Sequence, residues 1–406
     1  MTELATGAWC ELQHEYTLTM HRGRKTRTAA MKAGTRLHQT LEDEVHTTVK
    51  VQIAKKEDAF GLKLWNIIQG LRTLRDAGLT REMEVWGFVD GHVVNGLIDG
   101  LSYGHPDPEF EEEYRASQES SQEAQAPSSG QSRITTFFAT GNKAEPKPDT
   151  PSHPKVYLTD VKTRGTSTMP TGAAVRPTKI QLFLYHRFLS EMADGKLDYL
   201  HVIRRYGLDP DEPFSDEFLA EIGSLHDELF YGSPSSSPQT IVSPPRDTSS
   251  PPDLVKYHSL RSLLSLLKEE FRITFPMGAA SVGTCVAVDY RLRPRYTDEG
   301  VIDDEEIGRS IGQNIIPVHA PALDSYLDRY MQWWRGERAA KGVDIEEAAL
   351  KCRSCEFREI CTWRKEQDEE RLRAAKEKLQ AKKKAAVDAS AGDAQKRPKR
   401  KPRMTN

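Results

Sequence analysis

Residues 83–100 read MEVWGFVDGHVVNGLIDG, which is two runs of β-forming residues joined at Asp90-Gly91. An Asp-Gly pair between two such runs is a strong signal for a two-residue hairpin turn. The second run closes on Asp99, an acid at the end of an otherwise apolar stretch. We therefore predict a β-hairpin with strands at Met83–Phe88 and Val93–Leu101.

Helical and extended patterns alternate along the other folded parts of the chain. Helices are predicted where apolar residues recur at helical spacing, and strands where short runs are rich in β-branched residues. The predicted helices are Gly34–Val49, Glu57–Ala77, Thr178–Ala193, Leu260–Lys268 and Asp324–Arg338, and the further strands are Lys155–Lys162, Tyr199–Tyr206 and Val282–Arg293. This alternation is typical of an α/β fold with a mixed central sheet flanked by helices.

Two internal segments have compositions that cannot build a core. Residues 105–154 are rich in Ser, Gln, Glu and Pro, and residues 231–253 are rich in Ser and Pro, so we expect both to be disordered insertions. Residues 364–406 are predicted to form a charged helix and then a basic tail. The folded domain is therefore expected to consist of residues 1–104, 155–230 and 254–363.

Composition excludes several classes of protein. The chain of 406 residues has a formal net charge of −3 and no apolar run long enough to span a bilayer, so we expect no membrane association. Its first residues lack the features of a secretory signal or a mitochondrial presequence. Five cysteines in such a chain favour a metal or redox role over a disulfide framework.

Charge is distributed unevenly along the chain. Residues 21–36 carry six Lys or Arg residues and no acid, and the C-terminal tail is also basic. Local basic stretches of this kind are what a nucleic-acid-binding protein needs, whatever its net charge. A solvated loop is the alternative interpretation of residues 21–36.

Acidic residues close two predicted strands. Asp99 ends one, and the other ends in Thr159-Asp160-Val161-Lys162, where Asp160 and Lys162 point to the same face of the sheet. Two carboxylates at neighbouring strand ends can hold hard divalent cations, and a lysine beside them can stabilise charge on a phosphate. This pattern suits phosphodiester hydrolysis. The alternative is a turn residue, Asp99, and an ordinary ion pair at a strand end.

Two predicted helices present polar pairs one turn apart. Gly34, His38 and Glu42 share one face of the first helix, and Gln181 and Tyr185 share a face of the helix that follows Lys162. Each pair could be an ordinary part of an amphipathic helix.

Three cysteines, Cys352, Cys355 and Cys361, lie within ten residues. A tetrahedral thiolate site needs four ligands, so the fourth would come from a distant part of the chain, at Cys10 or Cys285. Cys285 lies in an apolar run, where cysteine is usually a small buried hydrophobic residue. One C-x2-C knuckle with a third cysteine differs from the paired knuckles of structural zinc sites, although zinc remains an alternative.

Taken together, these residues resemble the RecB-type nucleases of the PD-(D/E)xK superfamily. The order is G-x3-H-x3-E, G-h-h-D-G, D-x-K and Q-x3-Y, followed by the three clustered cysteines, with one cysteine at the start. Across residues 7–363, apart from the two insertions, the layout is similar to the eukaryotic exonuclease V family of single-strand DNA exonucleases. The resemblance implies a RecB-like nuclease core stapled by an iron–sulfur cluster.

The resemblance also implies a role for each motif residue. It assigns metal binding to His38, Asp99, Asp160 and the carbonyl of Val161, catalysis to Lys162, and positioning of DNA to Gln181 and Tyr185. It implies that Cys10, Cys352, Cys355 and Cys361 hold a structural [4Fe–4S] cluster. We expect Mg²⁺, with Mn²⁺ as a substitute, and hydrolysis by a metal-activated water.

Single-stranded DNA is the expected substrate. The candidate phosphate contacts are Arg22, Arg24, Lys25 and Arg27, and Trp9 or Tyr16 could stack on bases. The expected function is a monomeric exonuclease with a preference for 5′ ends that acts in genome maintenance. The alternatives are a flap or structure-specific endonuclease on the same fold, and a non-catalytic iron–sulfur scaffold that binds DNA.

Two further signals lie outside the core. In residues 131–138, which we term the clamp-like segment, Gln131, Ile134, Phe137 and Phe138 fit the Q-x-x-h-x-x-a-a pattern of peptides that dock on the sliding clamp PCNA. A local turn that packs the insertion onto the domain is the alternative. The basic residues at 382–384 and 396–403 indicate a bipartite nuclear localisation signal or a DNA-binding tail. We expect a nuclear protein, with the mitochondrion as the other compartment that the family uses.

Overall fold

The computed structural model describes residues 2–23, 29–46, 50–109, 154–222, 257–293, 296–297, 300–301 and 308–395. The chain divides into two compact units. The sheet unit comprises residues 1–5 and 26–335, and the cysteine unit comprises residues 6–25 and 336–406. Most of the first predicted insertion and all of the second lie outside the described residues.

The predicted hairpin is confirmed. Strands β1 (Leu79–Val89) and β2 (His92–Ser102) are antiparallel and joined by the two predicted turn residues. Asp90 has a φ of 51° and Gly91 a φ of 76°. Positive φ at both central positions defines the type I′ turn, whose twist matches that of the flanking strands.

A five-stranded mixed sheet forms the centre of the sheet unit. Its order is β1-β2-β3-β4-β7, with β3 at Val156–Arg164, β4 at Val282–Leu292 and β7 at Ser310–Pro317. Strands β3 and β4 are parallel, and the other neighbours are antiparallel. The predicted mixed α/β architecture is therefore confirmed, although edge strand β7 was not predicted. A separate small hairpin joins β5 (Tyr296–Thr297) to β6 (Gly300–Val301).

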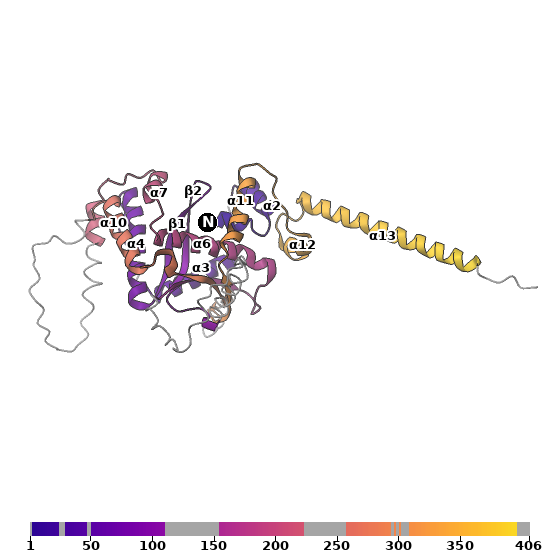
Figure 1. Ribbon diagram of the computed structural model, residues 1–406, viewed down its shortest axis with the longest axis horizontal. Helices are drawn as coiled ribbons and strands as arrows, with labels where there is room; N and C mark the ends of the chain where they lie inside the picture. The colour runs from indigo at the N-terminus through magenta and orange to yellow at the C-terminus, as the bar shows by residue number, and fades with distance from the viewer. Residues whose placement is uncertain are drawn as a thin grey trace, which may run out of the picture. The chain divides into compact units, whose positions relative to one another are not determined.

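Helices flank this sheet (Figure 1). They are α3 (Ala29–Asp43), α4 (Lys56–Ala77), α6 (Arg176–Ala193), α7 (Tyr199–Arg205), α10 (Leu260–Thr274) and α11 (Ala320–Trp334), with the short α1 (Thr2–Thr6) at the start of the chain. Helix α6 contacts β1 to β4, α3 contacts β1 and β3, and α4 packs on α10 and β1. A side chain at Gly87 would come within 2.0 Å of the Phe188 ring, so glycine allows α6 to approach β1 closely.

The strand predicted at Tyr199–Tyr206 is wrong, because this segment forms helix α7. The Asp198 side chain accepts a hydrogen bond from the His201 N–H at 3.0 Å and so caps the helix. Tyr199, Val202 and Ile203 are buried, which is helical rather than alternating spacing. The aromatic and β-branched composition of the segment suggested a strand. The N-terminal cap and the burial of residues at helical spacing favour a helix instead.

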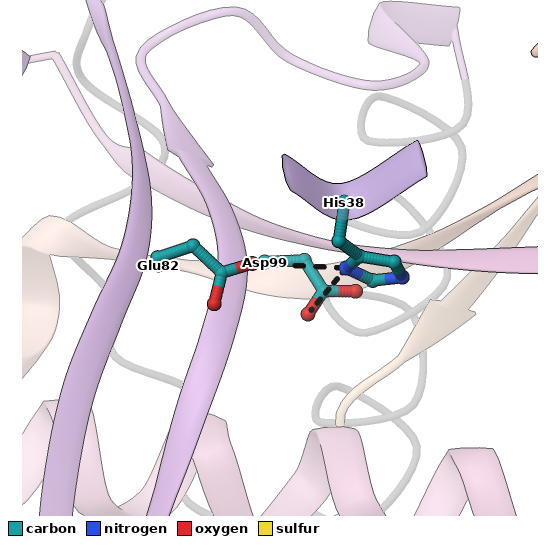
Figure 2. Close-up of side chains that lie close together, drawn as sticks. All are labelled: His38, Glu82 and Asp99. Carbon is teal, nitrogen blue, oxygen red and sulfur yellow. Dashed lines mark ion pairs between the residues drawn. The ribbon is translucent and has the colours of Figure 1, made fainter. Parts of the chain in front are cut away.

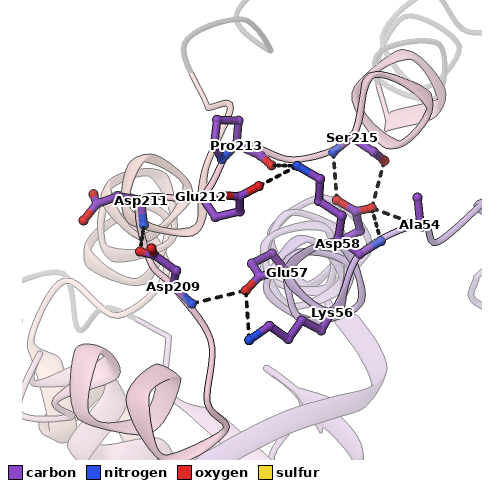
Figure 3. Close-up of polar contacts among 10 residues, drawn as sticks. Ala54, Lys56, Glu57, Asp58, Asp209, Asp211, Glu212, Pro213 and Ser215 are labelled. Carbon is purple, nitrogen blue, oxygen red and sulfur yellow. Dashed lines mark hydrogen bonds and ion pairs between the residues drawn. The ribbon is translucent and has the colours of Figure 1, made fainter.

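The first turn of α4 anchors the segment that follows α7 (Figure 3). The fully buried carboxylate of Asp58 accepts hydrogen bonds from the backbone of Ala54 and Lys55, and from both the N–H and the hydroxyl of Ser215. Burial disfavours the ionised form, but these hydrogen bonds outweigh it and lower the pKa of Asp58. The remaining helices predicted in this unit are confirmed, with ends that differ from the predicted ones by up to six residues.

The cysteine unit joins the beginning of the chain to its end. It contains α2 (Glu11–His21), α12 (Ile345–Lys351) and α13 (Thr362–Gln395), and α13 is one long helix, as the charged composition predicted. The Glu11 carboxylate accepts two hydrogen bonds of 2.6 Å from the Arg338 guanidinium and a third from the Lys341 N–H. The Tyr16 ring packs against Phe357.

None of the described helices is both long and apolar enough to cross a bilayer.

Candidate metal and cysteine sites

Three acids occupy one row across neighbouring strands: Glu82 on β1, Asp99 on β2 and Asp160 on β3. The residues on either side of Glu82 pair with those on either side of Asp99. The β2–β3 pairing ends one residue before Asp99 and Asp160 would face each other. Like charges directly opposite each other destabilise a sheet, so this row needs positive charge or protonation beside it.

Helix α3 places His38 over two of these acids (Figure 2). Its Nδ1 atom is 3.6 Å from Oδ1 of Asp99 and 3.7 Å from Oε1 of Glu82. One ligand atom from each of the three residues lies within 4.8 Å of the other two. Gly34, one turn earlier, allows this approach, because a side chain there would come within 3.1 Å of the Thr163 hydroxyl on β3.

Sequence reasoning missed Glu82, although the signal was present. A two-residue turn at Asp90-Gly91 sets residue 82 opposite residue 99, but the predicted strand began at Met83, just after Glu82, whereas β1 begins at Leu79. Glu82 also has a φ of 52°, in the left-handed region that non-glycine residues rarely adopt. Such strain is tolerated where the surrounding structure imposes it, and it recurs at functional sites.

The two predicted metal-binding acids, Asp99 and Asp160, differ in their exposure and in their hydrogen-bond partners. Asp99 Oδ2 accepts a 2.7 Å hydrogen bond from the Val161 N–H. Burial, followed by the charge of Asp160, raises the pKa of Asp99 to about 7. Asp160 is 1% exposed, and its Oδ1 accepts a hydrogen bond of 2.9 Å from Lys162. Among the described residues, its buried Oδ2 has no hydrogen-bond partner.

An unpartnered buried carboxylate oxygen requires an explanation, because nearly all such atoms in proteins are satisfied. Hard divalent cations prefer carboxylate oxygens, and histidine nitrogen is also a common metal ligand. The donor set of His38, Asp99 and Asp160 therefore fits a divalent cation chemically. Asp160 Oδ2 is one of several buried side-chain atoms without a hydrogen-bond partner among the described residues, and it is the one that lies in the acidic row.

The other predicted catalytic residues lie around the same acids. Burial alone would lower the pKa of Lys162, but the charges of Asp160 and Asp99 outweigh it and raise that pKa. Tyr185 accepts a 2.8 Å hydrogen bond from the Gln181 amide. Burial and the nearby carboxylates raise the pKa of Tyr185 to about 12. Lys162 is therefore held as a cation and Tyr185 as a neutral hydroxyl.

Of the four predicted phosphate contacts, Arg22 lies within the described residues. Arg22 is exposed at the end of α2, whereas Arg24, Lys25 and Arg27 lie outside the described residues. Both predicted stacking residues contact other side chains. The Lys351 ammonium lies over the Trp9 ring, 4.3 Å from its centre, and the Tyr16 ring packs on Phe357. The clamp-like segment and the end of the basic tail also lie outside the described residues.

Four cysteines of the cysteine unit line one pocket. They are Cys10, at the start of α2, and Cys352, Cys355 and Cys361, around the turns after α12. None of the four forms a disulfide with a described residue, and burial raises the pKa of Cys10, Cys352 and Cys355. Cys285 is buried in β4 of the sheet unit, as its apolar surroundings predicted.

The spacing of the sulfur atoms is wide for a zinc site. With Zn–S bonds of about 2.3 Å, the sulfurs of a tetrahedral site lie about 3.8 Å apart. Among the described residues, only His38, Glu82 and Asp99 bring three potential ligand atoms within 4.8 Å of one another. No three of the four cysteine sulfurs lie within that distance of one another.

Comparison with known proteins identifies relatives over most of the chain. Residues 1–364 match the family described as exonuclease V, a 5′ deoxyribonuclease. Exonuclease V of Danio rerio is 24% identical over 369 residues, which cover 90% of this chain and 70% of that protein. The mitochondrial exonuclease V of Eremothecium gossypii is 24% identical over 426 residues, covering 90% of this chain and 76% of that protein.

The raised pKa of Asp99 predicts how stability depends on pH in protein stripped of metal with EDTA. Because the folded pKa of about 7 exceeds the ordinary value of 3.8, the folded state binds the extra proton. The free energy of unfolding should therefore fall as pH rises across this interval, by on the order of a few kcal/mol. The shift of His38, whose pKa its Glu82 partner raises, acts in the same direction.

Urea unfolding of wild type and Asp99→Asn, measured at several pH values, isolates the Asp99 contribution. The variant should be the more stable protein at the upper end of the interval, and the difference should shrink towards its lower end. A difference that is constant with pH would contradict the prediction.

Proposed function

The chain belongs to the exonuclease V family, and we propose that it is a Mg²⁺-dependent exonuclease that degrades single-stranded DNA from 5′ ends. It is a nuclease, a hydrolase that acts on DNA, and the family is described as a 5′ deoxyribonuclease. The observation that carries the metal dependence is the row of acids under His38, with one buried oxygen of Asp160 left without a partner among the described residues.

In this proposal the core is of the PD-(D/E)xK type. His38, Asp99, Asp160 and the Val161 carbonyl would hold Mg²⁺, for which Mn²⁺ would substitute. The bound ion would supply a water of lowered pKa and charge stabilisation at the phosphate. The Val161 N–H supports the ligand set by fixing the orientation of the Asp99 carboxylate through its 2.7 Å hydrogen bond.

Lys162 and α6 would act on the DNA itself. The ammonium of Lys162 is held protonated beside Asp160, so it can offset negative charge that develops on the scissile phosphate. Gln181 and Tyr185, already bonded to each other, would position the strand. Arg164 follows two residues after Lys162 on the same strand face and would provide a further cation for a neighbouring phosphate.

The four cysteines would hold a structural [4Fe–4S] cluster. Three features support this. The first two are the shared pocket and the wide spacing of the sulfurs. A third is the small core of the cysteine unit, where the only buried apolar side chains among the described residues are those of Ala8, Val343 and Phe357. So little apolar burial cannot stabilise a fold alone, and small domains of this kind depend on a metal or disulfide staple.

A repair role in the nucleus is proposed from the basic tail and the clamp-like segment. The segment would tether the nuclease to PCNA by placing Ile134, Phe137 and Phe138 in an apolar pocket. The relative from Eremothecium gossypii is named as mitochondrial, so that compartment is the second candidate. A flap endonuclease on the same fold is the alternative activity, whereas membership of a nuclease family argues against a non-catalytic scaffold.

Digestion of labelled DNA tests the activity. We expect wild type with Mg²⁺ to shorten linear single strands from the 5′ end and to leave circular strands intact. Asp160→Asn should lose more than about a hundredfold in rate, because a cation ligand is removed, while it stays folded, because a repelling charge is also removed. Asp324→Asn, at a surface acid paired with Arg187, is the control. Cutting of circles would favour the endonuclease, and no Mg²⁺-dependent product would refute the proposal.

Iron and sulfide analysis tests the cluster. Wild type purified without oxygen should contain about four irons per chain. Cys361→Ser should lose most of its iron, and its cysteine unit should unfold and become sensitive to proteolysis. Cys285→Ser should keep its iron and a folded, protease-resistant cysteine unit. One zinc per chain without iron would show that the cluster assignment is wrong.

A pull-down with PCNA tests the tether. The double variant Phe137→Ala/Phe138→Ala should lose at least about tenfold in binding, because aromatic anchors dominate such contacts. Thr135→Ala/Thr136→Ala changes the two intervening residues and should bind as wild type does. Equal binding by all three proteins would end the hypothesis.

A further inference from the structure

We propose that the cysteine unit contains a binding site for single-stranded DNA, which holds a backbone phosphate and stacks a base. This proposal rests on the nuclease function proposed above and adds a place where the strand is held. The site, which we term the basic pocket, has a volume of about 280 Å³ and is lined by the end of α12, the turns after it and the start of α13. The lining side chains that carry the argument are Arg353, Arg358, Arg364, Arg371, Trp363 and Asp368.

Positive charge is concentrated in the basic pocket. Four arginines line it together with a single acid, Asp368. Guanidinium groups gathered in this way repel one another, and an anion between them removes the repulsion. The acids at the start of α12, Glu346 and Glu347, line a different pocket with Asp344 and Lys341. The two signs of charge are therefore segregated in this unit, whereas an ordinary solvated surface mixes them.

Two of the arginines are held in place by backbone carbonyls. Arg364 donates a hydrogen bond of 3.0 Å to the carbonyl of Arg358, and Arg371 donates one of 3.2 Å to the carbonyl of Ile345. A neutral carbonyl orients a guanidinium without cancelling its charge. Arg364 also lies 3.5 Å from Asp368, in the one ion pair that the lining residues make with each other among the described residues. Each guanidinium has five N–H donors, so donors remain for a phosphate.

The other two arginines are exposed and weakly engaged. Arg358 pairs with Glu359 at 2.8 Å, but both side chains are exposed, and such a pair contributes little. Arg353 makes no hydrogen bond or ion pair with any described residue. Both are therefore available to a ligand in the basic pocket.

Trp363 adds an aromatic ring to this cluster of cations. Its ring lies against the backbone of Gly342, because a side chain at Gly342 would come within 2.6 Å of the ring atoms. The ring is thus fixed in position and also lines the basic pocket. Proteins that bind single strands without sequence preference combine positive charge along the backbone with aromatic rings on which bases stack. The basic pocket contains both parts.

The proposed cluster is the other anionic group that these arginines could neutralise. Arg358 and Arg364 line the pocket of the four cysteines as well as the basic pocket. Arg353 and Arg371 line the basic pocket and not the cysteine pocket. Substitution of these two arginines therefore separates DNA binding from any role beside the cysteines.

Binding of a fluorescent oligothymidine to the full-length protein tests the proposal, with EDTA present to prevent digestion. Arg353→Ala/Arg371→Ala should bind on the order of tenfold more weakly than wild type, because charge-assisted hydrogen bonds to phosphate are lost. The slope of log affinity against log salt concentration should become shallower by about 0.7 for each phosphate contact removed.

The matched control is Lys365→Ala/Arg373→Ala. It removes the same charge from exposed positions of α13 that do not line the basic pocket, and it should bind as wild type does. Both double variants should keep the iron content of wild type. Free dAMP distinguishes a strand from a single nucleotide as the ligand, and wild type should bind it far more weakly than the oligothymidine.

Three results would overturn the proposal. The first is oligothymidine binding by Arg353→Ala/Arg371→Ala with the affinity and salt dependence of wild type. The second is loss of iron from this variant alone, which would show that the arginines serve the cluster. The third is tight binding of dAMP that only this variant loses, with oligothymidine binding unchanged, which would assign the pocket to a free nucleotide. Because binding is measured without digestion, a wild type that fails to digest DNA would refute the nuclease function and leave these results to decide the basic pocket.

Discussion

Electrostatic repulsion within the row of Glu82, Asp99 and Asp160 is the constraint that shapes the rest of the candidate site. Like charges opposite each other across a sheet destabilise it, and the near-complete burial of Asp160 strengthens its repulsion of Asp99 because water screens it little. The surrounding groups all compensate for it. A backbone N–H binds Asp99, an ammonium binds Asp160, and a histidine lies over the row. A sheet that needed only stability would carry apolar residues in these positions.

The register of one hairpin produces this row. A type I′ turn at Asp90-Gly91 leaves no freedom in the pairing of β1 with β2, so residue 82 must face residue 99. The sequence therefore held a further signal for the site, which the prediction did not use, because turn chemistry alone pairs a third acid with Asp99. Sequence patterns could not show that Glu82 adopts a left-handed backbone, since this depends on packing around the site rather than on local preference.

Other parts of the fold could not be predicted from local pattern for the same reason. Helix α7 contains residues that favour strands, and its buried spacing is only evident once α7 has a surface to pack on. Strand β7 contains Gly312 and ends at Pro317, both poor strand residues, yet it pairs with β4 along the edge of the sheet. The sequence places Gln181 and Tyr185 one helical turn apart, but it could not predict the hydrogen bond between them, because two residues one turn apart need not contact each other.

The two units of the chain differ in the interactions that stabilise them. The sheet unit buries large side chains such as Trp86, Phe183 and Phe188 completely, so hydrophobic burial can offset the repulsion within its acidic row. The cysteine unit has almost no such core among its described residues, and a two-bond ion pair between Glu11 and Arg338 joins its distant segments. Because a partly exposed salt bridge contributes little to stability, the proposed metal–thiolate bonds would have to supply most of the stability of this unit. Cys10 lies one residue before Glu11, so the proposed cluster would bind beside the ion pair that joins these two segments.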